Sequence, residues 1–285
     1  MLEKQHKNTA LSGSLLVLAS AIIFSLGGVV IKLLPWHSLS INAARNGVAL
    51  LITAVFVRCI RHKLVFNKSV LLGAAAMAAT TTLFCLATKM TTAANAILLQ
   101  YTSPVFIILY SWLFFRQKPK KLDIGMCVAS FAGIACFFMD SLSGGHLVGD
   151  GLALAAGAAY AVVFMSNLLP GGDAISAFFF GEVLSTAIGL PWLVQETAFT
   201  PATLAGGVGL GVIIGGGYVL LSIALCTTPP VAANLLSAVE PVLNPMWVAL
   251  FYGEILTPLA MAGFIIVLAS VVVYNVLVQR KRSEK

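Results

Sequence analysis

The chain has 285 residues, of which 59% are hydrophobic and 9% are charged, and its mean hydropathy is +0.98. Charged residues make up about 25% of a soluble globular protein, so the composition excludes a soluble fold and indicates a polytopic membrane protein. The net charge of +7 does not indicate a nucleic-acid partner, because the basic residues flank apolar segments and form no continuous patch.

The cysteines and histidines do not predict a metal or redox site. The five cysteines and four histidines are widely dispersed, with no pair at the spacing of zinc ligands or of a redox motif. We expect the cysteines to fill apolar space, and we expect no cofactor.

The pattern of hydropathy predicts an all-α fold. A helix needs about 20 apolar residues to cross a bilayer, and only helices satisfy the backbone of such runs inside the hydrocarbon. Short loops leave no room for a soluble domain, so any function must lie within the helix bundle. Ten transmembrane helices are predicted, at 10–32, 39–60, 69–89, 93–115, 122–139, 151–169, 174–194, 205–226, 230–251 and 257–278.

Basic residues predict the orientation of these helices. They cluster in the N-terminal tail, after the second and fourth spans and in the C-terminal tail, and none lies between Lys121 and Arg280. Because basic loops remain in the cytoplasm, we expect a multi-pass protein of the cell membrane, inner or plasma, with both termini cytoplasmic. His146 and Glu196 are then expected outside.

The chain contains an internal repeat. The segment 91–121 recurs 137 residues further on, so that Thr91 aligns with Thr228 and Pro104 aligns with Pro241. Such a fixed period indicates a duplicated unit, and we assign two five-helix repeats, 10–139 and 149–278. Five is an odd number, so the second repeat must be inverted relative to the first. Inverted repeats with a site at their interface are typical of secondary transporters.

Pro104 and Pro241 lie in the middle of the fourth and ninth spans. Each removes a backbone donor and clashes with the preceding turn. We interpret them as hinges, kinks that line a central cavity; a kink that serves packing alone is the alternative.

Three charges lie inside predicted spans, Arg45, Glu182 and Glu240. Each costs about 2.5–3.5 kcal/mol at a helix centre, which argues for a partner or a wet cavity. The functional interpretation makes Arg45 a contact for substrate charge and makes either glutamate a protonatable coupling group, so protons are candidate partners. The alternatives are a structural ion pair or a side chain that reaches the interface.

Polar and aromatic residues on the first, third, fourth, sixth, eighth and ninth spans are candidates to line a cavity for a small amphipathic solute. Hydrogen bonding between helices is the competing explanation for the Ser, Thr and Asn residues. The candidates are Phe24, Thr81, Gln100, Tyr101, Tyr160, Tyr218, Ser222, Asn234 and Ser237.

Glycines are concentrated in the eighth span, from Gly206 to Gly217. A nucleotide-binding loop needs a strand before it and a helix after it, so we predict close helix packing or flexibility instead. Gly125, Ala129 and Gly133 in the fifth span form a second pattern of small residues that predicts a close helix contact.

The two frames LLQYTSPVFIILYSWLFFRQKP and LLSAVEPVLNPMWVALFYGEILTP resemble the paired signature of the EamA family in the drug/metabolite transporter superfamily. Arg45, Glu240-Pro241 and Gly253-Glu254 match its pattern, whereas Arg116-Gln117 departs from the Gly-Glu pair that is usual in the first repeat. The resemblance covers essentially the whole chain. It implies a ten-helix exporter of small metabolites, amino acids among them.

The leading hypothesis is therefore a secondary transporter, without enzymatic activity, that works in a lipid bilayer. A passive channel or facilitator is the first alternative. A membrane enzyme acting on lipid-like substrates is the second, but it would need paired carboxylates or a His/Asp cluster at one membrane surface, and the sequence contains neither. A structural or sensory membrane protein is the third, and the repeat argues against it.

Overall fold

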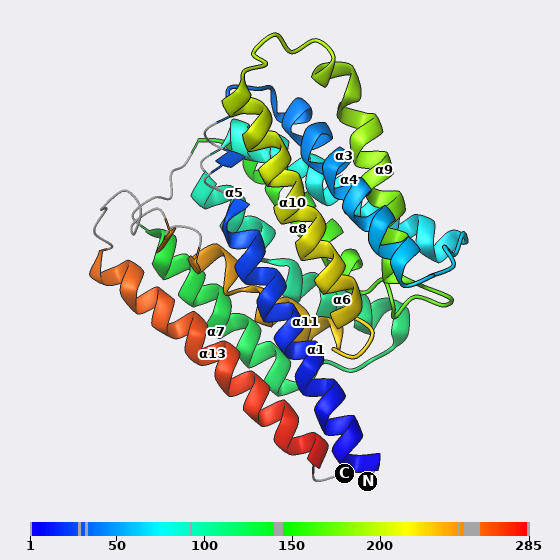
Figure 1. The fold of residues 1–285 in the computed structure, drawn as a ribbon. Helices are drawn as coiled ribbons and strands as arrows, with labels where there is room; N and C mark the ends of the chain where they lie inside the picture. Colours follow the sequence, from blue (N-terminus) through cyan, green and yellow to red (C-terminus); the bar gives the residue numbers. More distant parts are fainter. Residues whose placement is uncertain are drawn as a thin grey trace.

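The computed structural model describes residues 2–27, 30–31, 34–91, 93–139, 145–243, 246–247 and 257–283. Throughout these ranges the regular secondary structure is helical, as Figure 1 shows. The helices of the first half are α1 (Leu2–Ser25), α3 (Ser38–Cys59), α4 (Lys68–Met90), α5 (Ala93–Gln100), α6 (Ser103–Phe115) and α7 (Lys121–Phe138). Those of the second half are α8 (Leu147–Phe164), α9 (Ala174–Leu193), α10 (Pro201–Ala224), α11 (Pro230–Ser237) and α13 (Pro258–Ser283).

Helical structure lies within each of the ten predicted spans, which confirms the all-α polytopic fold. In the described part of the chain, six helices are long and apolar enough to cross a membrane, and three shorter helices are also apolar. The N- and C-termini lie at the same end of the bundle (Figure 1), as an even number of crossings requires. Gly253 and Glu254, which match the family pattern in sequence, fall outside the described residues.

Several helices begin at residues whose side chains cap the first turn. His37 and Asp173 each accept a backbone N–H at the starts of α3 and α9, and Asn67 does the same for α4. Thr200 and Thr203 form a reciprocal capping pair at the start of α10. Such caps satisfy donors that the helix itself leaves unpaired.

The two halves pack against each other in matched pairs. α1 packs on α10 as α8 packs on α4, and α3 packs on α10 as α9 packs on α4. Two further pairs, α3 with α9 and α7 with α13, join corresponding helices of the two halves. Exchanging the halves leaves this pattern unchanged, which is the arrangement expected of a duplicated unit folded around a two-fold axis.

Glycines allow α10 to approach α3 closely. A Cβ atom at Gly211 would meet Val48 and the Arg45 carbonyl, and one at Gly215 would meet Ala49 and Ile52. Gly207 faces Trp36, and Gly217 faces the ring of Phe24. The predicted close packing of this glycine-rich span is therefore confirmed, although Gly209 and Gly216 of the same helix face open space.

The small-residue pattern in α7 is confirmed in part. A Cβ atom at Gly133 would meet Ile266, Val267 and the Gly263 carbonyl of α13, whereas one at Gly125 would meet nothing within 4 Å. Gly133 therefore lies at a close α7–α13 contact, whereas Gly125 does not.

The fourth and ninth spans are interrupted, and the predicted kinks are instead breaks. α5 ends at Gln100 and α6 begins at Ser103, while α11 ends at Ser237 and helical structure resumes at Glu240. A proline clashes with the carbonyl four residues before it and tolerates the first turn of a helix. Gln100 and Ser237 are the residues four positions before Pro104 and Pro241, so each helix stops at the clash and restarts with its proline in the first turn.

Candidate functional site

The two breaks meet through Tyr101 and Glu240. The Tyr101 hydroxyl lies 2.8 Å from Glu240 Oε2 and 3.1 Å from the Ser237 carbonyl oxygen. That carbonyl is the one Pro241 leaves without a helical partner. A residue of the first half therefore satisfies the break in the second half and holds its carboxylate in the same contact.

Further contacts hold the same crossing together. The Ser103 hydroxyl donates to Asn234 Oδ1 at 3.1 Å, while the Asn234 amide nitrogen is buried without a partner among the described residues. The Thr102 hydroxyl donates to the Leu99 carbonyl at 2.6 Å. Gly157 of α8 lies against the Gln100 carbonyl, which a side chain at that position would displace.

Aromatic rings surround this crossing. Tyr218 packs edge-on against Phe24 at 5.0 Å and against Phe178 at 5.3 Å between ring centroids, and Tyr160 packs against Phe164 at 4.8 Å. Each half contributes rings to the group. Within the described residues the hydroxyls of Tyr160 and Tyr218 form no hydrogen bond. Polar donors on an apolar wall are typical of small-molecule sites.

Arg45 lies in a second polar group, on α3. Its Nη2 atom donates to Asn42 Oδ1 and to the Thr81 carbonyl, both at 3.2 Å. Thr81 also exchanges a hydrogen bond with Ser185 of α9 at 2.9 Å. Within the described residues Arg45 forms no ion pair with Glu240 or Glu182, so the structural ion pair considered for these residues does not occur.

Glu182 is fully buried on α9. Its Oε1 atom accepts a hydrogen bond from Thr53 at 3.1 Å, and its Oε2 atom has no partner in the described part of the chain. This carboxylate therefore lies at the α3–α9 contact, apart from the broken helices that hold Glu240.

Other predicted candidates serve their own helices. The hydroxyls of Ser222 and Ser237 donate to backbone carbonyls three and four residues earlier, at Val219 and Ala233. Gln100 is half-buried at the end of α5 and forms no side-chain hydrogen bond within the described residues.

The sequence hypotheses missed several residues that the structure brings to these groups. A signal existed for two of them, because Asn42, Arg45 and Asn46 have the spacing of a single helix face within an apolar span. The others carry no such signal in sequence. The missed residues are Asn42, Asn46, Thr53, Gly157, Phe178 and Ser185.

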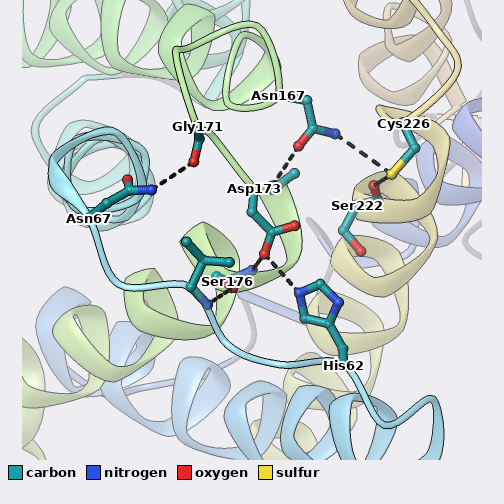
Figure 2. Close-up of polar contacts among 10 residues, drawn as sticks. His62, Asn67, Asn167, Gly171, Asp173, Ser176, Ser222 and Cys226 are labelled. Carbon is teal, nitrogen blue, oxygen red and sulfur yellow. Dashed lines mark hydrogen bonds and ion pairs between the residues drawn. The ribbon is translucent and has the colours of Figure 1, made fainter.

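A further polar cluster joins the loop after α3 to the loop before α9, as Figure 2 shows. His62 Nε2 lies 2.9 Å from Asp173 Oδ2, within hydrogen-bond distance, and Asn67 donates to the Gly171 carbonyl at 2.8 Å. Gly171 has a φ angle of +68°, a conformation that favours glycine. These contacts tie the two halves together at one end of α3 and α9.

Asp173 predicts a pH dependence of stability. Burial alone would raise its pKa, but hydrogen bonds from Ser176 and His62 outweigh burial and hold the pKa of Asp173 below its ordinary value of 3.8. The ionised carboxylate therefore stabilises the fold above pH 3.8, and this contribution is lost as the pH falls below that value. We expect Asp173→Asn to lower the unfolding temperature at pH 7 and to differ less from wild type near pH 3.

The measurement is thermal unfolding of the detergent-purified protein from pH 7 to pH 3. His62→Gln, which keeps a hydrogen-bond donor beside Asp173, is the matched control and should be affected less. A difference between wild type and Asp173→Asn that stays constant with pH would show that ionisation of Asp173 does not stabilise the fold.

Comparison with known proteins agrees with this architecture. The family model described as "EamA-like transporter family" matches residues 11–139 and again residues 147–276. A solved structure titled only "Crystal structure of protein" shares the fold with a TM-score of 0.76 at 14% identity, over 96% of this chain and 98% of that one. No curated protein matches the chain significantly. The chain thus belongs to the EamA-like transporter family and is a multi-pass membrane protein of the transporter class.

Proposed function

We propose that the protein is a secondary carrier that exports small metabolites, amino acids among them, across the cell membrane by alternating access. Both termini lie in the cytoplasm in this proposal. The observation that carries it is the crossing of two broken helices, one from each half, joined by Tyr101 and Glu240.

The breaks supply the movement that a carrier needs. Irregular backbone at membrane depth is tolerated only where it is covered by protein or faces water, and transporters place substrate sites at such breaks. In the first half, the angle between α5 and α6 can change at residues 101–102. In the second half, the angle between α11 and the helical residues that follow it can change at 238–239. The same geometry in both halves supports two related states, open to opposite sides.

Glu240 is the proposed coupling group. Its carboxylate accepts from a tyrosine, and no lysine, arginine or histidine in the described ranges forms an ion pair with it. Without a fixed cation beside it, the carboxylate is free to bind and release a proton during export. Glu182 is the second candidate, because Oε2 is buried without a partner in the described part of the chain.

Counterflow in proteoliposomes tests the proposal. We expect vesicles loaded with an unlabelled metabolite to accumulate the same labelled metabolite transiently, and we expect the rate to saturate. A panel of amino acids and other small metabolites covers the substrate class. Flux without saturation or counterflow would indicate a channel, and chemical change of the labelled compound would indicate an enzyme. Protein-free vesicles are the control.

A further inference from the structure

Arg45 is a buried cation whose hydrogen-bond partners among the described residues are neutral. The residue as a whole is 4% exposed to solvent. Nη2 donates to an amide oxygen and a backbone carbonyl, and Nε is buried without a hydrogen-bond partner among the described residues. Buried charges are ordinarily paired with an opposite charge, and an unpaired one is costly at membrane depth.

Neither buried glutamate serves as the partner of Arg45. Glu182 binds Thr53, which lies eight residues further along α3, about 12 Å at the rise of an α-helix. Glu240 binds Tyr101 at the helix breaks. Each glutamate therefore has another hydrogen-bond partner, and the positive charge of Arg45 is available to an anionic group other than Glu182 and Glu240.

The surroundings of Arg45 connect it to the candidate site. Gly211 of α10 lies against the Arg45 carbonyl, and Tyr218 follows seven residues, about two turns, further along the same helix. The ring of Tyr218 packs on Phe24 and Phe178, so α10 joins the region of Arg45 to an apolar surface. Such an arrangement suits a solute with a small apolar body and a charged end.

We propose that Arg45 binds the carboxylate of the transported solute, and hence that the substrates are small carboxylates with an apolar side group. Only the identification of this solute as a transported substrate rests on the proposed function. The binding site itself is inferred from the geometry of Arg45. Guanidinium groups bind carboxylates through charge-assisted hydrogen bonds, and the unpaired Nε of Arg45 is a donor for one.

Thermal unfolding of the detergent-purified protein tests the site without requiring transport. The probes are two matched pairs, sodium isovalerate with isovaleramide and L-leucine with L-leucinamide, titrated at constant ionic strength. We expect each carboxylate to raise the unfolding temperature of wild type more than its amide does. Replacing a charge-assisted hydrogen bond should weaken carboxylate binding to Arg45→Gln by roughly tenfold to a hundredfold.

Arg45→Lys keeps the positive charge and should retain part of the preference for carboxylates. Equal shifts with carboxylate and amide in wild type would overturn the proposal, as would a preference that survives in Arg45→Gln. If Arg45→Gln does not fold, the proposal is tested by comparing the two probe pairs in wild type and in Arg45→Lys. Carboxylate binding without counterflow would overturn the transport proposal but not the carboxylate site. Counterflow of the amides at the same rate as the acids would overturn the carboxylate site but not the transport proposal.

Discussion

Glu240→Gln is expected to remove the response of transport to an imposed pH gradient. Glutamine keeps the size of the side chain and an acceptor for the Tyr101 hydroxyl, but it does not titrate. Because glutamine cannot bind or release a proton, uptake by this variant should no longer rise when the gradient is imposed. The measurement is uptake into inverted vesicles with and without the gradient.

Two matched variants separate Glu240 from the other carboxylates. Glu182→Gln changes the buried carboxylate at Thr53, and Glu196→Gln changes a loop carboxylate that accepts from the His37 backbone. Both should keep the response to the gradient. If wild type ignores the gradient, proton coupling is wrong; if Glu240→Gln responds as wild type does, the proton is carried elsewhere and Glu182 is the next candidate.

Gly211→Leu is expected to destabilise the protein severely, whereas Gly209→Leu is expected to be tolerated. A Cβ atom at Gly211 would lie 3.0 Å from the Arg45 carbonyl and closer still to Val48, while one at Gly209 would have nothing within 4 Å. Overpacking of a tight contact lowers the stability by about 1–3 kcal/mol. A leucine side chain adds three further carbon atoms beyond its Cβ atom. Leucine at Gly209 also has the better helix propensity.

Thermal unfolding in detergent and the yield of monodisperse protein are the measurements for this pair. The two variants add the same side chain to the same helix, so their difference isolates the α3–α10 contact. Similar unfolding temperatures for both variants would show that α10 is free to move away from α3, and that the close packing does not limit stability.

Most of the fold was predictable because it depends on composition and length. A run of about 20 apolar residues must become a helix in a bilayer, and helical structure lies within every predicted span. The prolines were also recognised, but their effect was not. Whether Pro241 bends a helix or ends it depends on whether another group satisfies the Ser237 carbonyl, and that group, the Tyr101 hydroxyl, comes from the opposite repeat.

The candidate site was predictable in residue type but not in pairing. Tyr101, Glu240, Tyr160 and Tyr218 stood out as polar or charged groups within apolar spans, and the structure brings them together. Arg45 and Glu182 stood out for the same reason, yet they lie in separate contacts. A one-dimensional pattern shows that a buried charge needs a partner without showing which helix supplies it.

The sequence by itself therefore determined the helices, the duplication and the short set of residues able to carry charge at membrane depth, since each follows from local hydropathy and spacing. Only the tertiary structure decided that the two breaks cross and that Tyr101 joins Glu240 to the Ser237 carbonyl. It also decided that Arg45 donates to neutral groups within the described part of the chain. The physical reason is that the hydrogen bonds from Arg45 and Tyr101 to other helices join residues 36 to 139 positions apart, and they depend on how the helices pack rather than on any local pattern.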